Sequence, residues 1–306
     1  MSSFSQTAST ECSSSTEIEI LRLAMDPTGT IFRRLSAIHA WRSPHSKRLR
    51  PVDKSDAMPP PPSKKSHELF RISDGALELT KWIAMVIMTA DHINKYLFDE
   101  SLPFIFEFGR TAMPLFVFVL TYNLARPSSN INGGAYLRTA RRLALCGLIS
   151  SVPYSKLGGL LDDWYPLNIF FTLLVITTVA GLIEQSRTGK VRVPAVLTAL
   201  AAFVMGGGLV EFWWPAVGLG VGAWIYFRSG NLLGLLTSVA SCASLRWVNG
   251  NHWALAAFPI LFILSRLNVQ MPRLRWFFYA YYPVHLMVLL LVRIPMERAG
   301  YVFWYT

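Results

Sequence analysis

Two titratable residues, Asp91 and His92, stand side by side within an apolar stretch that runs from Leu79 to Phe98. A stretch of about 20 apolar residues is long enough for a helix to cross a membrane. An ionisable side chain in hydrocarbon costs roughly 2.5–3.5 kcal/mol, so such residues usually face a protein interior and mark a site or pathway. A carboxylate beside an imidazole can orient the ring as a general base. The alternative is a structural polar cluster that ties helices together.

Two further polar residues occur in apolar stretches, Arg110 and His285. Arg110 requires a partner, and we expect Asp91 to supply it because both lie at a similar predicted depth. Such a pair is either structural or leaves the guanidinium able to polarise a carbonyl oxygen. His285 follows Tyr282 and Pro283, and it is either a satisfied interior residue or a second catalytic candidate. We predict no metal, because no ligand spacing joins these residues to His92.

The composition predicts the elements that hold these residues. The chain has 306 residues, of which 52% are hydrophobic and 15% charged, whereas soluble chains have about 25% charged residues. The repeated apolar runs predict an all-α fold, a polytopic transmembrane helix bundle. Ser73 and Asp74 are typical of a helix cap for the first span. About nine spans are expected, near 76–98, 103–125, 136–153, 166–184, 193–210, 212–227, 231–248, 252–267 and 275–293.

Residues 1–70 differ from this pattern. They contain a Ser/Thr-rich segment, a polyproline tract and scattered Lys and Arg, a composition that cannot bury a core. We predict a disordered basic extension over 1–70 and a transmembrane domain over 71–306. The formal net charge of +11 is better explained by Lys and Arg in cytoplasmic loops than by nucleic-acid binding.

The charges between the predicted spans alternate, so the positive-inside rule places the N-terminus in the cytoplasm. His92, Arg110 and Asn168 then belong to the outer half of the bundle. Arg138 and Arg141 lie at the cytoplasmic face, and residues three apart share one face of a helix. Two guanidinium groups there could bind a polyphosphate; the alternative is ordinary positive-inside charge.

Several motifs together resemble the TraX family of conjugative-transfer membrane proteins. The matching stretch runs from about Ser73 to the C-terminus and leaves the N-terminal extension unexplained. The positions that carry the resemblance are Ser73, Asp74, Leu79, Lys81, Ala84, Met88, Asp91, His92 and Ile93, then Gly109, Arg110, Ala112, Pro114, Leu115, Phe116 and Phe118, then Tyr122, Asn123, Leu124, Ala125 and Arg126, then Asn168, Ile169, Phe171, Thr172 and Leu173, and finally Tyr282, Pro283, His285 and Leu286. Where relatives show an acidic-aromatic-Gly stretch, this chain has Glu211-Phe212-Trp213.

The resemblance implies a multi-pass protein of the bacterial inner membrane that acetylates the N-terminus of a pilin subunit. Acetyl-CoA would be the donor, and membrane lipid would surround the protein. TraX proteins also look like distant relatives of membrane acyltransferases with a first-helix His and an Arg-x-x-Arg motif, which Arg138 and Arg141 fit. The remaining positions expected to bind the substrates are Lys81, Asn94, Arg138, Arg141, Asn168 and Tyr282.

In the expected reaction, His92 removes a proton from the acceptor amine and Asp91 orients His92. Arg110 or a tyrosine hydroxyl stabilises the oxyanion. His285 could instead be the base, or either imidazole could carry the acetyl group transiently. Two alternatives stay open: an acyltransferase for another peptide, a glycan or a lipid, and a proton-coupled transporter, since intramembrane Asp, His and Arg also build proton relays.

Overall fold

The computed structural model describes residues 71–129, 131–158, 164–188 and 192–303. The predicted disordered extension over 1–70 lies outside these residues. Within them the chain is helical and has no strand, apart from one isolated bridge between Leu167 and Val210. The helices are α2 (Asp74–Leu97), α3 (Pro103–Gly109), α4 (Ala112–Ala125), α5 (Ala135–Lys156), α6 (Ile169–Thr188), α7 (Arg192–Ala201), the π-helix η3 (Ala202–Gly206), α8 (Gly207–Leu209), α9 (Trp213–Ser229), α10 (Leu232–Ser244), α11 (Arg246–Asn249), the 3₁₀-helix η4 (Trp253–Ala256), α12 (Ala257–Ser265) and α13 (Arg275–Arg298).

The all-α prediction is confirmed for these residues, whereas the number of spans stays a prediction. Four segments are long and apolar enough to cross a membrane: Pro103–Ala125, Ile169–Arg187, Arg192–Leu209 and Trp276–Arg298. Each of the other predicted intervals contains a helix. However, α10 has 13 residues and so rises only about 20 Å, and α2 carries five charged side chains. Helix α10 is therefore shorter, and α2 more highly charged, than the four candidate spans.

Helix α2 begins where the capping signal predicts. The Ser73 side chain accepts a hydrogen bond from the Ala76 N–H at 3.1 Å, and Asp74 occupies the first turn. A capping oxygen satisfies one of the N–H groups that a helix start leaves unpaired. The cap thus fixes the beginning of the helix that carries Asp91 and His92.

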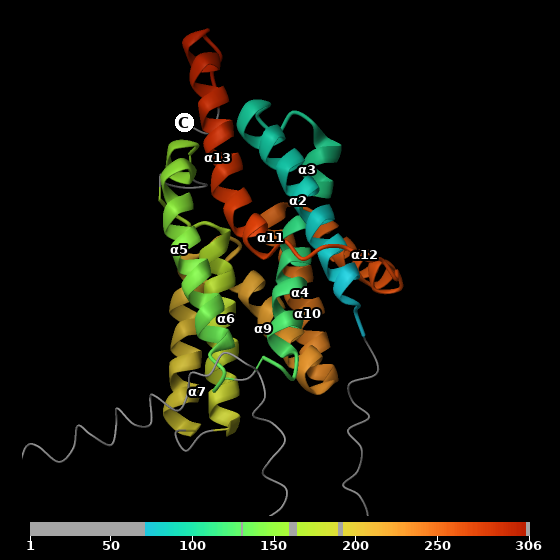
Figure 1. Cartoon of the computed structure of the whole chain (residues 1–306). Coiled ribbons are helices and arrows are strands. Elements are labelled where there is room, and N and C mark those ends of the chain that lie inside the picture. Colours follow the sequence, from blue (N-terminus) through green and yellow to red (C-terminus); the bar gives the residue numbers. More distant parts are fainter. Residues whose placement is uncertain (1–70, 130, 159–163, 189–191, 304–306) are drawn as a thin grey trace, which may run out of the picture. The chain divides into compact units, whose positions relative to one another are not determined.

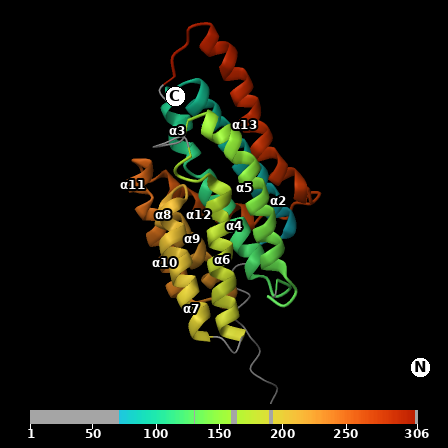
Figure 2. The same cartoon turned by 90° about the vertical axis from the view of Figure 1, so that its left-hand side faces the viewer.

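Helix α9 lies at the centre of the bundle and packs against α4, α6 and α10. Its glycines allow the closest of these contacts: a Cβ on Gly222 would lie 2.7 Å from the Ser238 nitrogen and 2.8 Å from the Gly234 oxygen. Two helices can approach this closely only where side chains are absent. In Figures 1 and 2, α5, α6 and α7 run alongside one another, while α13 packs on α5 and α2.

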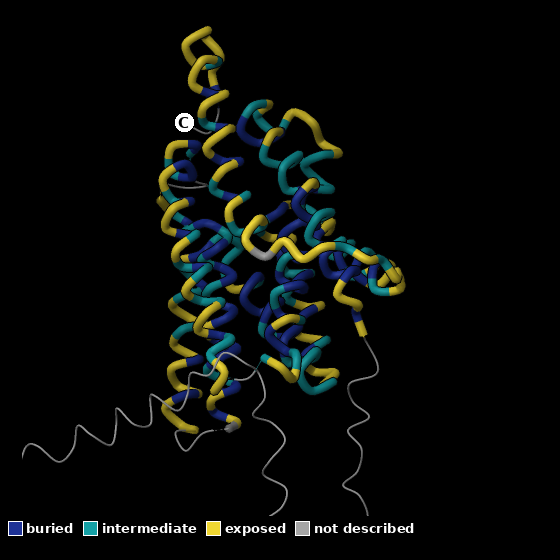
Figure 3. Tube along the Cα trace, in the orientation of Figure 1, coloured by how far each residue is buried: buried dark blue, intermediate teal, exposed yellow. Residues whose placement is uncertain are grey.

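The outward faces of several helices are apolar and exposed. Figure 3 shows exposed positions along α7 and α13, among them Val196, Leu197 and Leu200 on α7 and Val288 and Leu291 on α13. A soluble protein rarely exposes such continuous apolar surface. These faces are those of a membrane protein, with lipid as the surrounding solvent.

Candidate functional site

A cavity of about 470 Å³ follows one face of α2. The α2 residues that line it recur at every turn: Asp74, Leu77, Glu78, Lys81, Met85, Met88, Asp91, His92 and Lys95. The distance from the first to the last of these is about 31 Å at 1.5 Å per residue. That length matches the roughly 30 Å hydrocarbon core of a bilayer. We call its two ends the Asp74 end and the Glu100 end.

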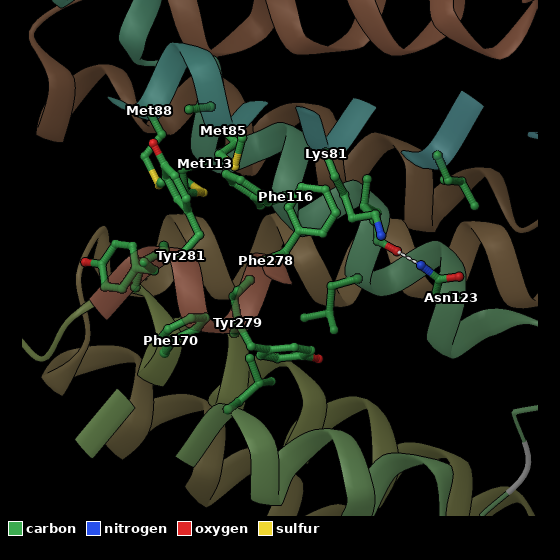
Figure 4. Close-up of a pocket in the computed structure, with 18 of the residues that line it drawn as sticks. Lys81, Met85, Met88, Met113, Phe116, Asn123, Phe170, Phe278, Tyr279 and Tyr281 are labelled. Atoms are coloured by element: carbon green, nitrogen blue, oxygen red, sulfur yellow. Dashed lines mark hydrogen bonds between the residues drawn. The ribbon is translucent and has the colours of Figure 1, made fainter. Parts of the chain in front are cut away.

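The middle of the cavity is apolar. In Figure 4, Met85 and Met88 of α2 lie near Met113 of α4, Tyr281 of α13 reaches toward Met88, and Phe170 lies across the space from them. Thioether and aromatic side chains form a flexible, polarisable lining. The charged residues that line the cavity are therefore separated into two groups, one at each end.

His92 of α2 and His285 of α13 form a hydrogen-bonded pair. His92 Nδ1 and His285 Nε2 lie 2.7 Å apart, and the two rings are within 12° of parallel. His285 is buried, whereas His92 lines the cavity. The two imidazoles, 193 positions apart in the chain, thus belong to one site.

The hydrogen bonds of this pair define the proton positions. His285 Nδ1 lies 3.1 Å from the Tyr281 carbonyl oxygen, which can only accept, so Nδ1 carries the proton. A neutral His285 then accepts at Nε2, and His92 must donate from Nδ1. Neutral His92 therefore has its lone pair at Nε2, for which no partner is found among the described residues. Of the two imidazoles, His92 is the one able to take a proton from a ligand.

Asp91 pairs with Arg110, as the sequence predicts. Arg110 Nη2 lies 2.6 Å from Asp91 Oδ1, and each side chain is 14% exposed. The expectation that Asp91 orients His92 differs from what is found, since His285 holds that ring. Arg110 is positioned by a break between α3 and α4, where its Nε donates to the Phe106 carbonyl at 3.1 Å.

Gly109 makes room for the Asp91–Arg110 pair. A Cβ at this position would lie 2.3 Å from Asp91 Oδ1 and 2.5 Å from Asp91 Cγ. Real Cβ atoms do not approach other atoms so closely. The glycine next to Arg110 is therefore required for the carboxylate to lie where it does.

The Asp74 end is strongly basic. Asp74 pairs with Arg126 and with Arg273, each at 2.5 Å. Lys81 contacts Glu78 at 2.7 Å and lies over the Phe278 ring. Arg142 also lines the cavity here and covers the Trp276 ring. Four basic side chains, Lys81, Arg126, Arg142 and Arg273, thus surround this end with two carboxylates.

Four of the predicted substrate-binding residues do not line the cavity. Asn94 is buried and exchanges hydrogen bonds with the Leu102 backbone at 3.1 and 3.2 Å. Asn168 is buried too and donates to the Gly147 carbonyl at 3.0 Å. The remaining two, Arg138 and Arg141, are exposed and lie outside the lining. The side-chain amides of Asn94 and Asn168 thus bind backbone groups of other segments. The two other predicted residues, Lys81 and Tyr282, do line the cavity.

Sequence reasoning did not assign a role to several lining residues. Arg126, Arg142 and Arg273 resemble positive-inside charge, and Arg142 is adjacent to the predicted Arg141. Lys95 extends the polar face of α2, one turn after His92, and is buried. Its position three residues after His92 was the signal that could have found it.

Within residues 71–303 as described, no group of three His, Cys, Asp or Glu residues is arranged to hold a metal ion.

The comparisons with known proteins agree on one family. The family model described as TraX protein matches residues 76–293. Protein TraX from Escherichia coli is 31% identical over 152 residues, which are 49% of this chain and 52% of that protein. The chain therefore spans about half the length of this curated relative. No solved structure matches.

Proposed function

This chain belongs to the TraX family, and from that premise we propose that it is a conjugation-associated membrane N-acetyltransferase. It transfers acetyl from acetyl-CoA to the N-terminal amine of a pilin subunit or a similar peptide. The observation that carries the proposal is the His92–His285 pair, of which His92 lines a cavity about as long as a bilayer core is thick. His285 on α13 forms a hydrogen bond with His92 on α2 and so orients the His92 ring.

The acyl transfer requires one base. An α-amino group has an ordinary pKa of about 7.7–8.0, so a modest base suffices to neutralise it. His92 takes a proton from the ammonium group at Nε2, and His285 keeps the ring oriented. The amine nitrogen then forms a bond to the thioester carbonyl carbon, and the C–S bond breaks. The nitrogen loses its second proton as the C–S bond breaks, and the CoA thiolate takes up this proton and leaves as the thiol.

Arg110 supplies positive charge near the reacting carbonyl. Its guanidinium is held by Asp91 and by the Phe106 carbonyl, so it is already oriented before substrate binds. A fixed donor costs no reorganisation when charge develops on the oxyanion. Arg110 therefore acts as the electrostatic partner of the tetrahedral intermediate.

The Asp74 end binds the CoA phosphates. Guanidinium groups form charge-assisted hydrogen bonds with phosphate, and Arg126, Arg142 and Arg273 gather there with Lys81. The apolar middle of the cavity accommodates the uncharged arm that carries the thioester. This assignment replaces Arg138 and Arg141, which lie outside the lining.

The same assignment orients the protein. Acetyl-CoA is cytosolic, and the positive-inside rule puts basic connections in the cytoplasm. The Asp74 end then faces the cytoplasm of a bacterial inner membrane, and the Glu100 end faces outward, where the acceptor enters. The N-terminus of the chain is cytoplasmic in this arrangement.

A proton-coupled transporter is the second candidate function. The observation in its favour is the cavity itself, since it runs the length of α2 and contains Asp91, His92 and Arg110. Charged residues in such a position also occur along transport pathways. A transporter leaves its substrate chemically unchanged, so the two functions have different products.

The test is acetylation of co-expressed candidate pilins, read by intact mass with and without the protein. We expect a gain of one acetyl group on the N-terminus. His92→Ala should reduce the rate by about 10²–10⁴-fold, and His285→Ala should reduce it less, at normal protein levels. Unmodified pilin with the wild-type protein, or wild-type acetylation in both variants, contradicts the proposal.

A further inference from the structure

We infer that Glu211 binds the primary ammonium group of the acceptor and holds it beside His92 until the proton is removed. The inference rests on the proposed function and assigns the acceptor side of the same cavity. Glu211 and the neighbouring Phe212 line the Glu100 end, together with His92 and Lys95. A carboxylate in a cavity next to aromatic side chains has the chemistry of a cation site.

The backbone of Glu211 is fixed on both sides. Its N–H donates to the Leu167 carbonyl at 2.9 Å, and its carbonyl accepts from the Thr172 hydroxyl at 2.9 Å. The next two residues, Phe212 and Trp213, have φ values of 64° and 49°. Non-glycine residues adopt this region rarely and at an energetic cost. The strained turn redirects the chain directly after Glu211, so the carboxylate is presented from a rigid support.

Two buried tyrosines lie in the electrostatic range of this carboxylate. Tyr282 and Tyr154 both interact electrostatically with Glu211, and both side chains are buried. The Tyr154 hydroxyl has no hydrogen-bond partner among the residues that the structure describes. A buried polar group without a partner costs free energy. Of the two tyrosines, Tyr282 is the one that lines the cavity with Glu211 and can contact a ligand bound there.

Lys95 balances the charge of Glu211 when no acceptor is bound. Both side chains line the Glu100 end of the cavity, where their opposite charges attract each other. Lys95 also lies on the same face of α2 as His92, three residues away. An ammonium group thus already lies at the same end of the cavity as this carboxylate, and the acceptor ammonium carries the same charge.

The other carboxylate beside His92 is not available for this role. Asp91 is engaged by Arg110 at 2.6 Å, and a buried pair of this kind is costly to break. Glu211 has no comparable arginine partner at ion-pair distance within the described part of the chain. The acceptor amine therefore binds Glu211, and the Asp91–Arg110 pair stays intact.

The test measures binding rather than turnover. The probe is the fluorescent amine L-alanine 7-amido-4-methylcoumarin, with its N-acetylated form as the uncharged control, bound to the purified full-length protein. Glu211→Gln keeps the size and removes the charge, and we expect roughly thirtyfold weaker binding of the free amine. Glu107→Gln is the matched control, because Glu107 lies on α3 outside the cavity lining. Glu107→Gln should bind the free amine as tightly as the wild type does. Glu211→Asp should bind it with an affinity between those of the wild type and Glu211→Gln.

CoA binding in the same samples verifies that each variant is folded, since its phosphates are expected at the Asp74 end. The inference is overturned if Glu211→Gln binds CoA and the free amine as tightly as the wild type does. It is also overturned if the wild type binds the N-acetylated probe as tightly as the free amine. If Glu211→Gln loses the amine while no acetylation of any pilin occurs, the ammonium site stands and the proposed acetyl transfer fails.

Discussion

The two ends of the cavity hold their charged groups in different ways. At the Asp74 end, the two ion pairs of Asp74 join partly exposed side chains: Asp74 is 56% exposed, Arg273 41% and Arg126 26%, whereas the Lys81–Glu78 pair is more buried. At the Glu100 end, Asp91 and Arg110 are each 14% exposed, and His92 is held by His285. Exposed pairs exchange partners at low cost, whereas buried ones are preorganised. The Asp74 end is therefore suited to binding a diffusible anion, and the Glu100 end is suited to catalysis.

Gly109→Ala disturbs the preorganised end and should have a larger effect than substitutions at the Asp74 end. The added Cβ would lie 2.3 Å from Asp91 Oδ1, so the carboxylate and Arg110 must shift. A displacement of about 1 Å at a reacting group can reduce the rate by roughly 10²-fold. Acetylation rate and thermal unfolding of the purified variant would measure the effect.

Gly208→Ala provides the control, because its Cβ would meet only Trp214, at 3.3 Å. We expect it to retain near wild-type rate. Equal losses in the two glycine variants would mean that general packing, and not the Asp91–Arg110 pair, determines activity.

A paired substitution at the Asp74 end should have an intermediate effect. Removing both Arg126 and Arg273 with glutamine should raise the KM for acetyl-CoA by about tenfold and leave kcat nearly unchanged, since two phosphate contacts are lost. The double variant of Arg138 and Arg141 removes the same charge from positions outside the cavity. It should leave the KM unchanged, and the reverse result would return the CoA site to the Arg-x-x-Arg motif.

The smallest effect is the acid dependence of Asp74. The hydrogen bond from Arg126, with the charges of Arg126 and Arg273, lowers the pKa of the Asp74 carboxyl below its ordinary value of 3.8. Because the folded pKa is below the unfolded one, the stabilisation is complete above the unfolded pKa and is lost as the pH falls through the folded pKa.

The melting temperature of the wild type should therefore fall more steeply than that of Asp74→Asn between roughly pH 5 and pH 3. Thermal unfolding in a pH series would measure both slopes. Parallel curves for the two proteins would mean that the exposed pairs contribute nothing to stability.

The sequence predicted the residues that are unusual in hydrocarbon. Asp91, His92, Arg110 and His285 stand out because a polar group within an apolar run is costly, and the structure brings all four together. The capped start of α2 followed from Ser73 in the same way. These features depend on local composition and require no knowledge of how the helices pack.

Other features depend on packing and could not be read from the sequence. Asn94 and Asn168 are polar and lie at suitable predicted depths, yet both amides bind backbone groups of other segments. Arg142 lines the cavity while its neighbour Arg141 is exposed, because adjacent helical residues point about 100° apart. Which side of a helix faces the cavity, and which group an amide binds, depends on how the neighbouring helices pack.

The site joins α2 to α13, the first and last helices that the structure describes, through a hydrogen bond that spans 193 positions. During synthesis, His92 enters the membrane long before His285 has been translated. His92 therefore lacks its hydrogen-bond partner until α13 inserts and docks. Under the proposed function, acetyl transfer would begin only at the end of biogenesis, and a chain that stalls before its last helix would carry the cavity-lining face of α2 with His92 unoriented.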